Sequence, residues 1–270
     1  MRLLFIGDIM GRSGRTAVAT HLPDLRKDLG LDFVVANGEN AAAGFGITAK
    51  IAEQLFETGI DCISSGNHIW DQKEIMPFMD SEKRILRPLN YPKGTPGRGV
   101  GDYKLADGRR VIVINAMGRV FMDAIDDPFA GVNDALSRYG LGQTAHAIIV
   151  DIHGEATSEK MAMGQYVDGR VSMTVGTHSH IPTADAQILP RGSAYQTDAG
   201  MCGDYDSVIG MDKEEPLRRF TKKIGRERFK PAMGEATFCA VYVETDDKSG
   251  LARTISPVRL GGRLKSIRPE

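Results

Sequence analysis

The sequence predicts a layered α/β sandwich in which a mixed β-sheet core is flanked by helices. Short β-branched runs alternate with longer stretches whose apolar residues recur every three or four positions, the pattern of strands followed by amphipathic helices. The 270 residues can bury a substantial core. Length alone would also allow two small domains, but one domain covering residues 1–270 is favoured, and we find no internal repeat, low-complexity tract or linker.

The elements follow in chain order. Strands are predicted at residues 2–6, 32–36, 61–64, 111–115, 146–151 and 171–177. Helices predicted at 14–29 and 48–58 separate the first three strands into βαβ units. Residues 91–108 are rich in glycine and proline and predict a surface excursion, suited to a lobe or an oligomer contact, with a hairpin turn at Asp107-Gly108. Residues 234–244 and 253–263 predict late strands that add an antiparallel element.

Composition excludes several classes of protein. Lys and Arg number 34 against 35 for Asp and Glu, so no bulk field attracts nucleic acid or an anionic membrane nonspecifically. Cys62, Cys202 and Cys239 are far apart and form no metal-binding or redox motif, so we expect them to be reduced and mostly buried. The first apolar run is too short for a signal peptide, and no later run approaches the roughly 20 residues of a membrane helix. We therefore expect a cytoplasmic protein.

Side chains that can bind metal follow five of the predicted strands, each in a turn that contains glycine. The five turns are Gly7-Asp8, Gly38-Glu39-Asn40, Gly66-Asn67-His68, His153-Gly154-Glu155 and Gly176-Thr177-His178-Ser179-His180. In open α/β folds the carboxyl ends of the strands line the ligand crevice. We therefore expect the five turns to converge in space.

Most of these turns, taken alone, have an ordinary structural explanation. Asp8 could end a strand or cap a helix, Glu39-Asn40 could cap a helix, and Asn67-His68 could form a left-handed turn. His178 and His180 are harder to explain in this way, because residues two apart in an extended segment present their nitrogens to the same side. This spacing favours a metal-binding role for the two histidines.

Together the turns supply oxygen donors early in the chain and imidazoles late, with no thiolate among them. This mixture suits iron, manganese or zinc better than magnesium alone or an iron–sulfur cluster. Two ions are favoured over one, because a carboxylate between two half-sets of ligands can bridge them. Ions roughly 3.5 to 4 Å apart can share a hydroxide while they hold a phosphoryl oxygen, so no protein nucleophile is needed.

The five motifs together resemble those of the calcineurin-like metallophosphoesterases. The runs at residues 5–11, 37–41, 66–71 and 197–201 are more similar still to the bacterial YmdB-like phosphodiesterase branch, and the resemblance covers nearly the whole chain. Two positions depart from the wider superfamily. Met10 stands where many relatives have a second ligand histidine, and Glu39 replaces the usual bridging aspartate. Both departures resemble the YmdB-like branch, in which an asparagine after the bridge helps to complete the first site, and they leave the metal identity open.

The resemblance implies a calcineurin-like sandwich with its active site at the carboxyl ends of the strands. It implies that Glu39 bridges two ions, one also held by Asp8, Asn40 and His180, and the other also held by Asn67, His153 and His178. It further implies that a bridging hydroxide attacks phosphorus in line, while His68 donates a proton to the leaving oxygen or stabilises charge on the phosphoryl group. The implied substrate is a small phosphodiester, in particular a 2′,3′-cyclic nucleotide, and the implied assembly is a homo-oligomer.

Two other functional classes stay open at this point. The chain could be a metal-bound regulator that recognises RNA or a protein, or it could be a phosphomonoesterase such as a nucleotidase. The basic run at residues 218–230 could contact RNA, but Leu217, Phe220 and Ile224 fall at helical spacing, which favours a helix whose charges face solvent.

Some polar and glycine-rich positions carry weaker signals. The segment 44–46 could line a substrate cleft, although a loop that leads into a helix is the favoured interpretation. Residues 198–206 could approach a nucleotide or form a surface turn. His21 and His146 are assigned no function, because one falls within a predicted helix and the other at the start of a strand.

Overall fold

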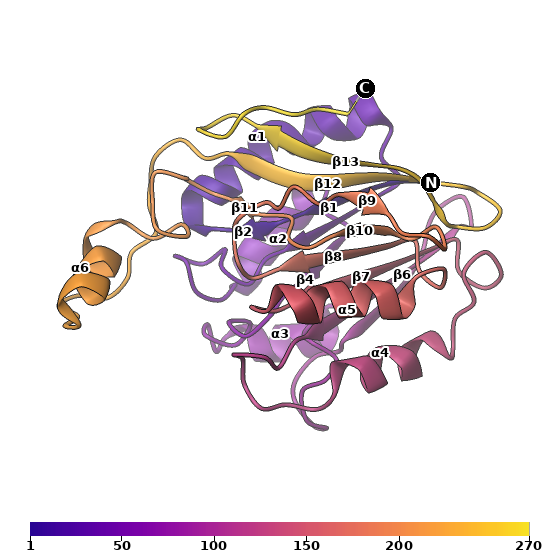
Figure 1. Ribbon diagram of the computed structural model, residues 1–270, viewed down its shortest axis with the longest axis horizontal. Coiled ribbons are helices and arrows are strands. Elements are labelled where there is room, and N and C mark those ends of the chain that lie inside the picture. Colours follow the sequence, from indigo (N-terminus) through magenta and orange to yellow (C-terminus); the bar gives the residue numbers. More distant parts are fainter. Residues whose placement is uncertain (270) are drawn as a thin grey trace.

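The structure is a computed structural model that describes residues 1–269, and it consists of two β-sheets packed face to face between helices (Figure 1). The first sheet has the order β13-β12-β1-β3-β4. Its strands are β1 (Arg2–Ile6), β3 (Phe33–Asn37), β4 (Cys62–Ser64), β12 (Phe238–Thr245) and β13 (Ala252–Leu260). The predicted layered α/β class is confirmed.

The second sheet has the order β5-β6-β7-β8-β10-β9. Its strands are β5 (Val100–Lys104), β6 (Arg110–Met117), β7 (Ala147–His153), β8 (Met173–Thr177), β9 (Gln187–Ile188) and β10 (Ala194–Gln196). A short parallel pair, β2 (Asp8–Ile9) and β11 (Met201–Cys202), lies beside the first sheet. The helices are α1 (Gly11–Leu29), α2 (Ala49–Glu57), α3 (Ile75–Ser81), α4 (Pro128–Leu136), α5 (Thr157–Val167) and α6 (Glu214–Lys222).

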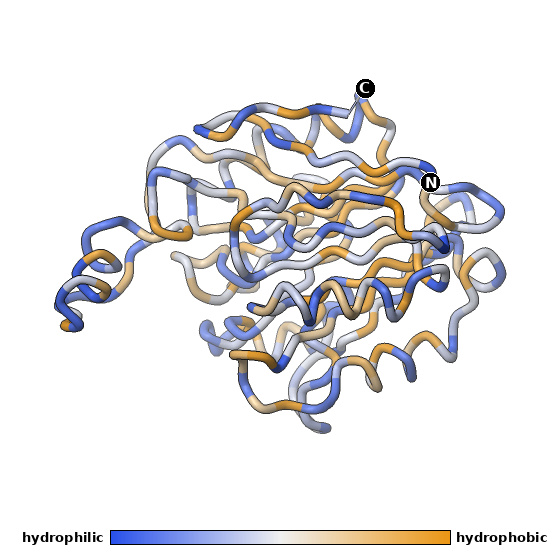
Figure 2. The backbone as a smooth tube through the Cα atoms, viewed as in Figure 1, coloured by the Kyte–Doolittle hydropathy of each residue, from blue (hydrophilic) through white to orange (hydrophobic). Residues whose placement is uncertain are grey.

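The core is divided into layers by the alternation of side chains along the strands. In β1, Leu3 and Phe5 join the apolar cluster between the two sheets, whereas Leu4 and Ile6 pack in the cluster that contains α1, α2 and α3. On the second sheet, the outer residues of β6 and β7 pack against α4 and α5. Because the central strands are buried on both faces, they form nearly continuous apolar runs, which Figure 2 shows as orange segments in the middle of the molecule.

Strand direction places the predicted turns together. Strands β1, β3 and β4 are parallel to one another, and so are β6, β7 and β8. The antiparallel pairs are β12 with β1, β12 with β13, β5 with β6, and β9 with β10. The carboxyl ends of the parallel strands therefore meet at one edge of the sandwich.

The ends of the predicted helices have clear local causes. The amide N–H of Ile51 donates to Thr48 Oγ1 at 3.2 Å, so Thr48 caps the first turn of α2. Helix α1 ends at Leu29, and the next residue, Gly30, has a φ of 59°, the left-handed conformation that glycine adopts without strain. Both predicted helices are confirmed, with the observed start of α1 at Gly11.

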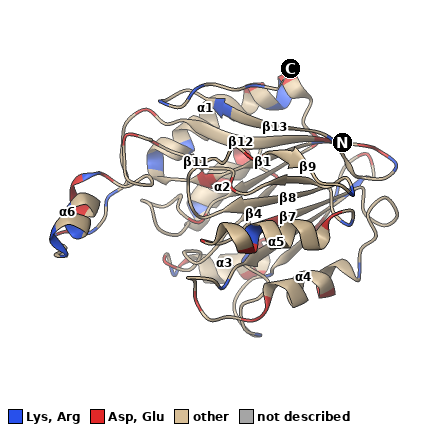
Figure 3. Cartoon of the chain, in the orientation of Figure 1, with Lys and Arg blue, Asp and Glu red and all other residues tan. Residues whose placement is uncertain are grey.

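The fold corrects one sequence interpretation and confirms another. Residues 91–108 are only partly a surface excursion, because 100–104 form the edge strand β5; the hairpin turn at Asp107-Gly108 connects it to β6. The helix expected from the spacing of Leu217, Phe220 and Ile224 is confirmed as α6, and these apolar residues are themselves 52%, 74% and 70% exposed. Helix α6 projects from the body of the molecule (Figure 1), and blue and red segments along its ribbon mark its basic and acidic residues (Figure 3).

The three cysteines are buried and form no disulfide, as predicted. Within residues 1–269, none of the helices combines the length and the apolar character that a membrane crossing requires.

Candidate metal centre

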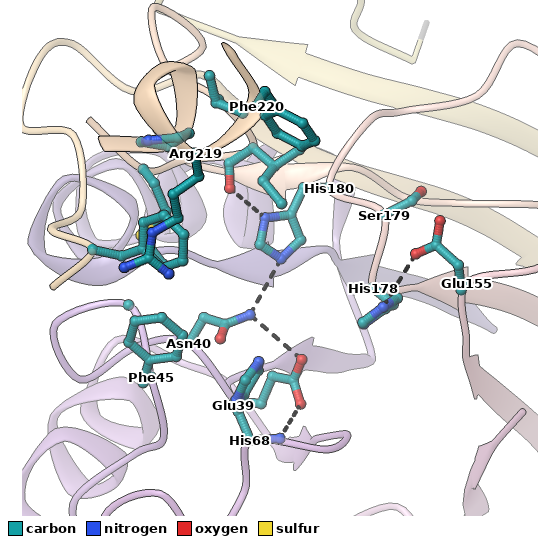
Figure 4. A pocket seen from close by; sticks show the side chains of 16 residues that line it. Glu39, Asn40, Phe45, His68, Glu155, His178, Ser179, His180, Arg219 and Phe220 are labelled. Carbon is teal, nitrogen blue, oxygen red and sulfur yellow. Dashed lines mark hydrogen bonds and ion pairs between the residues drawn. The ribbon is translucent and has the colours of Figure 1, made fainter. Parts of the chain in front are cut away.

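The edge where the parallel strands end holds all seven residues predicted as ligands. Asp8 follows β1, Glu39 and Asn40 follow β3, and Asn67 follows β4, all on the first sheet. His153 ends β7, and His178 and His180 follow β8, all on the second sheet. The cluster therefore lies across the junction of the two sheets, and Figure 4 shows its pocket side.

One group of donor atoms surrounds His153. Its Nε2 lies 3.0 Å from Asn67 Oδ1, 3.0 Å from His178 Nδ1 and 3.1 Å from Glu39 Oε1. His153 Nδ1 lies 2.9 Å from Thr177 Oγ1, and that hydroxyl donates to Asp151 Oδ1 at 2.8 Å. The hydroxyl can therefore only accept from the imidazole, which places the proton on Nδ1 and leaves a lone pair on Nε2.

The imidazole of His178, in the same group, is also oriented by a hydrogen-bond acceptor. His178 Nε2 lies 3.3 Å from Glu155 Oε2, an acceptor, so Nε2 carries the proton and Nδ1 offers a lone pair. Lone pairs of Glu39, Asn67, His153 and His178 then face one another with no proton between them. Such an arrangement is repulsive unless a cation lies among these atoms.

A second group forms around His180. Its Nδ1 donates to the carbonyl oxygen of Ile209 at 2.7 Å, so Nε2 again has a lone pair. This nitrogen lies 3.2 Å from the amide nitrogen of Asn40 and 3.7 Å from Asp8 Oδ1. The amide nitrogen of Asn40 is also 3.4 Å from Glu39 Oε1, so Glu39 borders both groups.

The two buried carboxyl groups have very different electrostatic surroundings. Burial raises the pKa of Asp8 to about 6. Burial also opposes the ionisation of Glu39, but the neighbouring imidazoles of His153 and His68 and the hydrogen bond from the backbone N–H of His68 outweigh it and lower its pKa to about 2. For His178, burial and the neighbouring His153 imidazole lower the pKa to about 3. Glu39 is thus the anion of the cluster, and His178 is a neutral imidazole.

An unsatisfied oxygen indicates what the cluster lacks. Asp8 is fully buried, and its Oδ1 has no hydrogen-bond partner among the described residues, although Oδ2 accepts from the backbone N–H of His178 at 3.3 Å. A buried polar atom without a partner costs about 1–3 kcal/mol, more if it is charged. Oxygen and imidazole donors of this kind fit transition-metal ions, and a cation would satisfy Asp8 Oδ1.

The segment that carries His178 and His180 is not extended, which corrects the sequence argument for their shared direction. Both residues have positive φ, 97° for His178 and 66° for His180. The chain turns directly after β8, so the two imidazoles reach different groups. Non-glycine residues adopt such angles only when their surroundings stabilise them, and they are frequent at functional sites.

A buried ion pair holds this turn in place. Asp198 Oδ2 accepts from the backbone N–H of Ser179 at 3.1 Å and from its hydroxyl at 2.7 Å, and it pairs with Lys160 Nζ at 2.8 Å. Asp198 and Lys160 are 0% and 1% exposed. Residues 198–206 are therefore not simply a surface turn, because the first of them, Asp198, holds the turn that contains His178 and His180.

Close packing explains two of the glycines in the predicted turns. A Cβ atom at Gly66 would lie 2.1 Å from His153 Nε2, and one at Gly176 would lie 1.8 Å from the carbonyl oxygen of Thr197. Any side chain at Gly66 would therefore displace the imidazole.

His68 lies beside the cluster rather than in it. Its backbone N–H donates to Glu39 Oε2 at 3.1 Å, and its Nδ1 pairs with Asp71 Oδ2 at 2.8 Å. The side chain is partly exposed and lines the pocket, so its Nε2 remains available for a bound molecule. Sequence reasoning assigned His68 but not Asp71, although the spacing of three residues could have suggested a pair.

Three further supporting residues were missed or left without a role. Asp151 interrupts the apolar run at residues 147–152 of strand β7, and that contrast was the available signal. Glu155 stands in the same turn as His153, and Asp198 stands in the run at residues 197–201. The histidines assigned no function, His21 and His146, lie outside the cluster.

The cluster opens into a pocket of about 420 Å³. One side is polar and includes Glu39, Asn40, His68, His178 and His180. The other side is largely apolar and includes Phe45, Phe220 and Phe229. A volume of this size suits a small ligand.

The two-sheet sandwich, with carboxylate, amide and imidazole donors gathered at its strand ends, has the architecture of a calcineurin-like metallophosphoesterase. The chain belongs to the YmdB-like family. The model of this family, described as YmdB-like protein, matches residues 4–258.

Similar proteins cover nearly the same length. The chain is 44% identical over 258 residues to a Bacillus subtilis protein named 2′,3′-cyclic-nucleotide 2′-phosphodiesterase, and the match covers 96% of this chain and 96% of that protein. A Thermus thermophilus crystal structure, described as that of a hypothetical protein, has a TM-score of 0.90 and 44% identity, with 97% and 100% coverage. A Mycoplasma pneumoniae structure described as a novel phosphatase also has a TM-score of 0.90, with 32% identity and coverage of 97% and 93%.

Proposed function

We propose that this protein is a metal-dependent phosphodiesterase that hydrolyses 2′,3′-cyclic nucleotides. The observation that carries the proposal is the convergence of donor lone pairs around His153 Nε2, together with the unsatisfied Oδ1 of Asp8 beside the second group. The choice of substrate is supported by the name of the Bacillus subtilis relative.

The residues divide into two ligand sets with Glu39 in common. Asp8, Asn40 and His180 would hold one ion, and Asn67, His153 and His178 would hold the other. Iron or manganese is proposed first and zinc as the alternative, because the donors are oxygen and imidazole without sulfur. When bound, the two ions would supply Lewis-acid polarisation of the phosphoryl oxygens and a water of lowered pKa.

His68 is proposed as the proton donor to the leaving oxygen. Asp71 accepts from Nδ1 and so orients the ring, which lines the pocket. The backbone N–H of His68 also holds Glu39, which links the position of the proton donor to that of the shared carboxylate.

The first test is hydrolysis of 2′,3′-cyclic AMP by the purified protein, with metal content determined on the same sample. We expect turnover with about two transition-metal ions per chain, as the two-metal mechanism requires. Glu39→Ala should lose both, whereas Glu53→Ala, which removes an exposed carboxylate from α2, should lose neither. Two ions without turnover would contradict the proposed reaction but not the metal site, and absence of metal would contradict both.

A phosphomonoesterase is the second candidate, favoured by the description of the Mycoplasma pneumoniae structure as a phosphatase. Comparison of 2′,3′-cyclic AMP with 3′-AMP separates the two. A higher kcat/KM for the monoester would replace our assignment.

We further propose that the chain acts as a homo-oligomer, because the projecting helix α6 and the residues after it expose Leu217 and Ile224, which another copy could cover. Light scattering at micromolar concentration measures this directly, and a monomeric mass would reject it.

A further inference from the structure

The apolar half of the pocket is not required by the hydrolytic chemistry. It is formed by Phe45 and by residues from the segment 208–229, namely Ile209, Met211, Arg219, Phe220 and Phe229. These side chains lie next to the proposed metal ligands, since His180 Nδ1 donates to the carbonyl oxygen of Ile209. A phosphodiester held at the metal cluster would therefore extend its remaining atoms along this wall.

The floor of this half is a compact cluster of methionines. Met10, Met201 and Met211 are buried together, and Phe45 and Phe229 pack against them. Gly44 has a φ of 88°, and a Cβ there would lie 3.2 Å from Met211 Cε, so the loop carrying Phe45 approaches the cluster closely. The side-chain amide of Gln72 donates to the carbonyl oxygen of Phe45 at 2.9 Å and fixes the loop from the other side. These contacts hold the aromatic ring of Phe45 in a fixed position beside the pocket.

Phe220 supplies a second aromatic surface from the projecting helix. Its ring lines the pocket but is 74% exposed. In the view of Figure 4, Phe220 lies above His180 and Phe45 lies below it. An exposed ring beside an enclosed apolar floor can gain stabilisation by stacking on a planar ligand.

Arg219 shows how such a ligand would be recognised. Its guanidinium lies 4.0 Å over the ring of Phe229, its Nε donates to Glu215 Oε1 at 2.8 Å, and its Nη2 donates to the carbonyl oxygen of Glu227 at 2.8 Å. Among the described pocket-lining residues between 208 and 229, Arg219 alone has a polar side chain, and these contacts engage its Nε and Nη2. This wall therefore offers planar and apolar surfaces with a single guanidinium, rather than a set of hydrogen-bonding groups that could read the edge of a base.

We propose that this half of the pocket is a nucleobase subsite that binds by stacking, with Phe220 as its exposed ring. The proposal rests on the proposed function, because a cyclic nucleotide carries the base. Stacking is tolerant of base identity, since each base has a π-face. Purine substrates should be preferred over pyrimidine substrates because they present the larger face, and adenine and guanine should be discriminated weakly.

The experiment compares 2′,3′-cyclic AMP with a base-free analogue, methyl ribofuranoside 2′,3′-cyclic phosphate, in the metal-loaded protein. We expect the wild type to favour the nucleotide, and Phe220→Ala to reduce this preference by roughly 5- to 150-fold through KM, the range expected for loss of one base stack. Phe220→Tyr should retain the preference. Leu217→Ala removes another exposed apolar side chain from the same helix, but one outside the pocket lining, and should leave the preference unchanged.

A binding measurement separates the failure of the subsite from the failure of the proposed function. Calorimetric titration with adenosine, which has no phosphate, should show binding to the wild type and weaker binding to Phe220→Ala whether or not the protein turns over a phosphodiester. Equal turnover of both substrates, with no adenosine binding, would overturn the subsite and leave the phosphodiesterase intact. Adenosine binding that is sensitive to Phe220, without turnover, would support the subsite and overturn the proposed reaction.

Discussion

At the scale of single residues, the candidate centre depends on where protons are held. Thr177 and the carbonyl of Ile209 each take the Nδ1 proton of one histidine, so Nε2 of His153 and Nε2 of His180 face the cluster as lone pairs. Neutral imidazoles oriented in this way are the usual metal ligands. The supporting groups therefore determine the chemistry as much as the ligands themselves.

The pair of His68 and Asp71 leads to a prediction at this scale. We expect His68→Gln to lower kcat by roughly 10² to 10⁴, the usual contribution of a general acid, without loss of bound metal. Asp71→Asn should lower kcat less, because the imidazole remains but loses its carboxylate partner. Steady-state kinetics and metal analysis on the same samples measure both quantities.

His146→Gln is the matched control, because His146 is exposed and lies outside the pocket lining. Loss of metal in His68→Gln would show that His68 acts as a ligand or supports Glu39, and it would contradict the assigned role.

At the scale of elements, the turn after β8 shows how strain is stabilised by partners distant in sequence. His178 and His180 have positive φ, and the residue between them is tied to Asp198, which pairs with Lys160 on α5. Removal of one partner from a buried ion pair leaves the other charge without compensation.

We expect Asp198→Asn to reduce the free energy of unfolding by about 3–5 kcal/mol, as is typical when one member of a buried pair is removed. The double variant Asp198→Asn with Lys160→Met should recover part of this loss, because no uncompensated charge remains. Denaturant unfolding of both single variants and of the double variant gives the coupling. A purely additive cycle would contradict the role of the pair.

Helix α6 illustrates the limit of periodicity. The spacing of Leu217, Phe220 and Ile224 correctly indicates a helix over part of residues 218–230, but it does not show what the apolar side chains contact. Phe220 lines a pocket formed mainly by other elements, and periodicity carries no information about such distant neighbours.

At the scale of the whole molecule, the two sheets share one apolar layer, to which Phe5 and Val35 contribute from the first sheet and Val113 and Ile149 from the second. The proposed metal ligands lie at the junction of the same two sheets. We therefore propose that the chain unfolds as one unit and that bound metal stabilises the whole of it.

Chelation and reloading test this proposal. Metal at about 100 times its Kd should raise the free energy of unfolding of the metal-free protein by about 2.7 kcal/mol, and circular dichroism and intrinsic fluorescence should report a single coincident transition. Asp8→Asn, which removes a proposed ligand, should reduce the stabilisation. Two separate transitions would show that the sheets belong to different folding units.

Local patterns were sufficient for much of the fold. The apolar runs predicted the central strands, because strands buried on both faces must be apolar throughout. Most later helices and the short strands β9, β10 and β11 were not predicted. Helix α5 shows why: its buried members include Lys160 as well as Met163 and Val167, so the buried face is not simply apolar.

The sequence by itself determined which residues could bind metal and that they follow strands, because the residue type and the turn after each strand are local properties. It also allowed the family to be identified from motifs. Only the tertiary structure decided which nitrogen of each imidazole faces the cluster, that Asp198 supports the histidine turn, and that Phe220 lines the pocket. These features depend on contacts between residues far apart in the chain, such as His153 with Glu39 and His180 with Ile209, which no local pattern encodes.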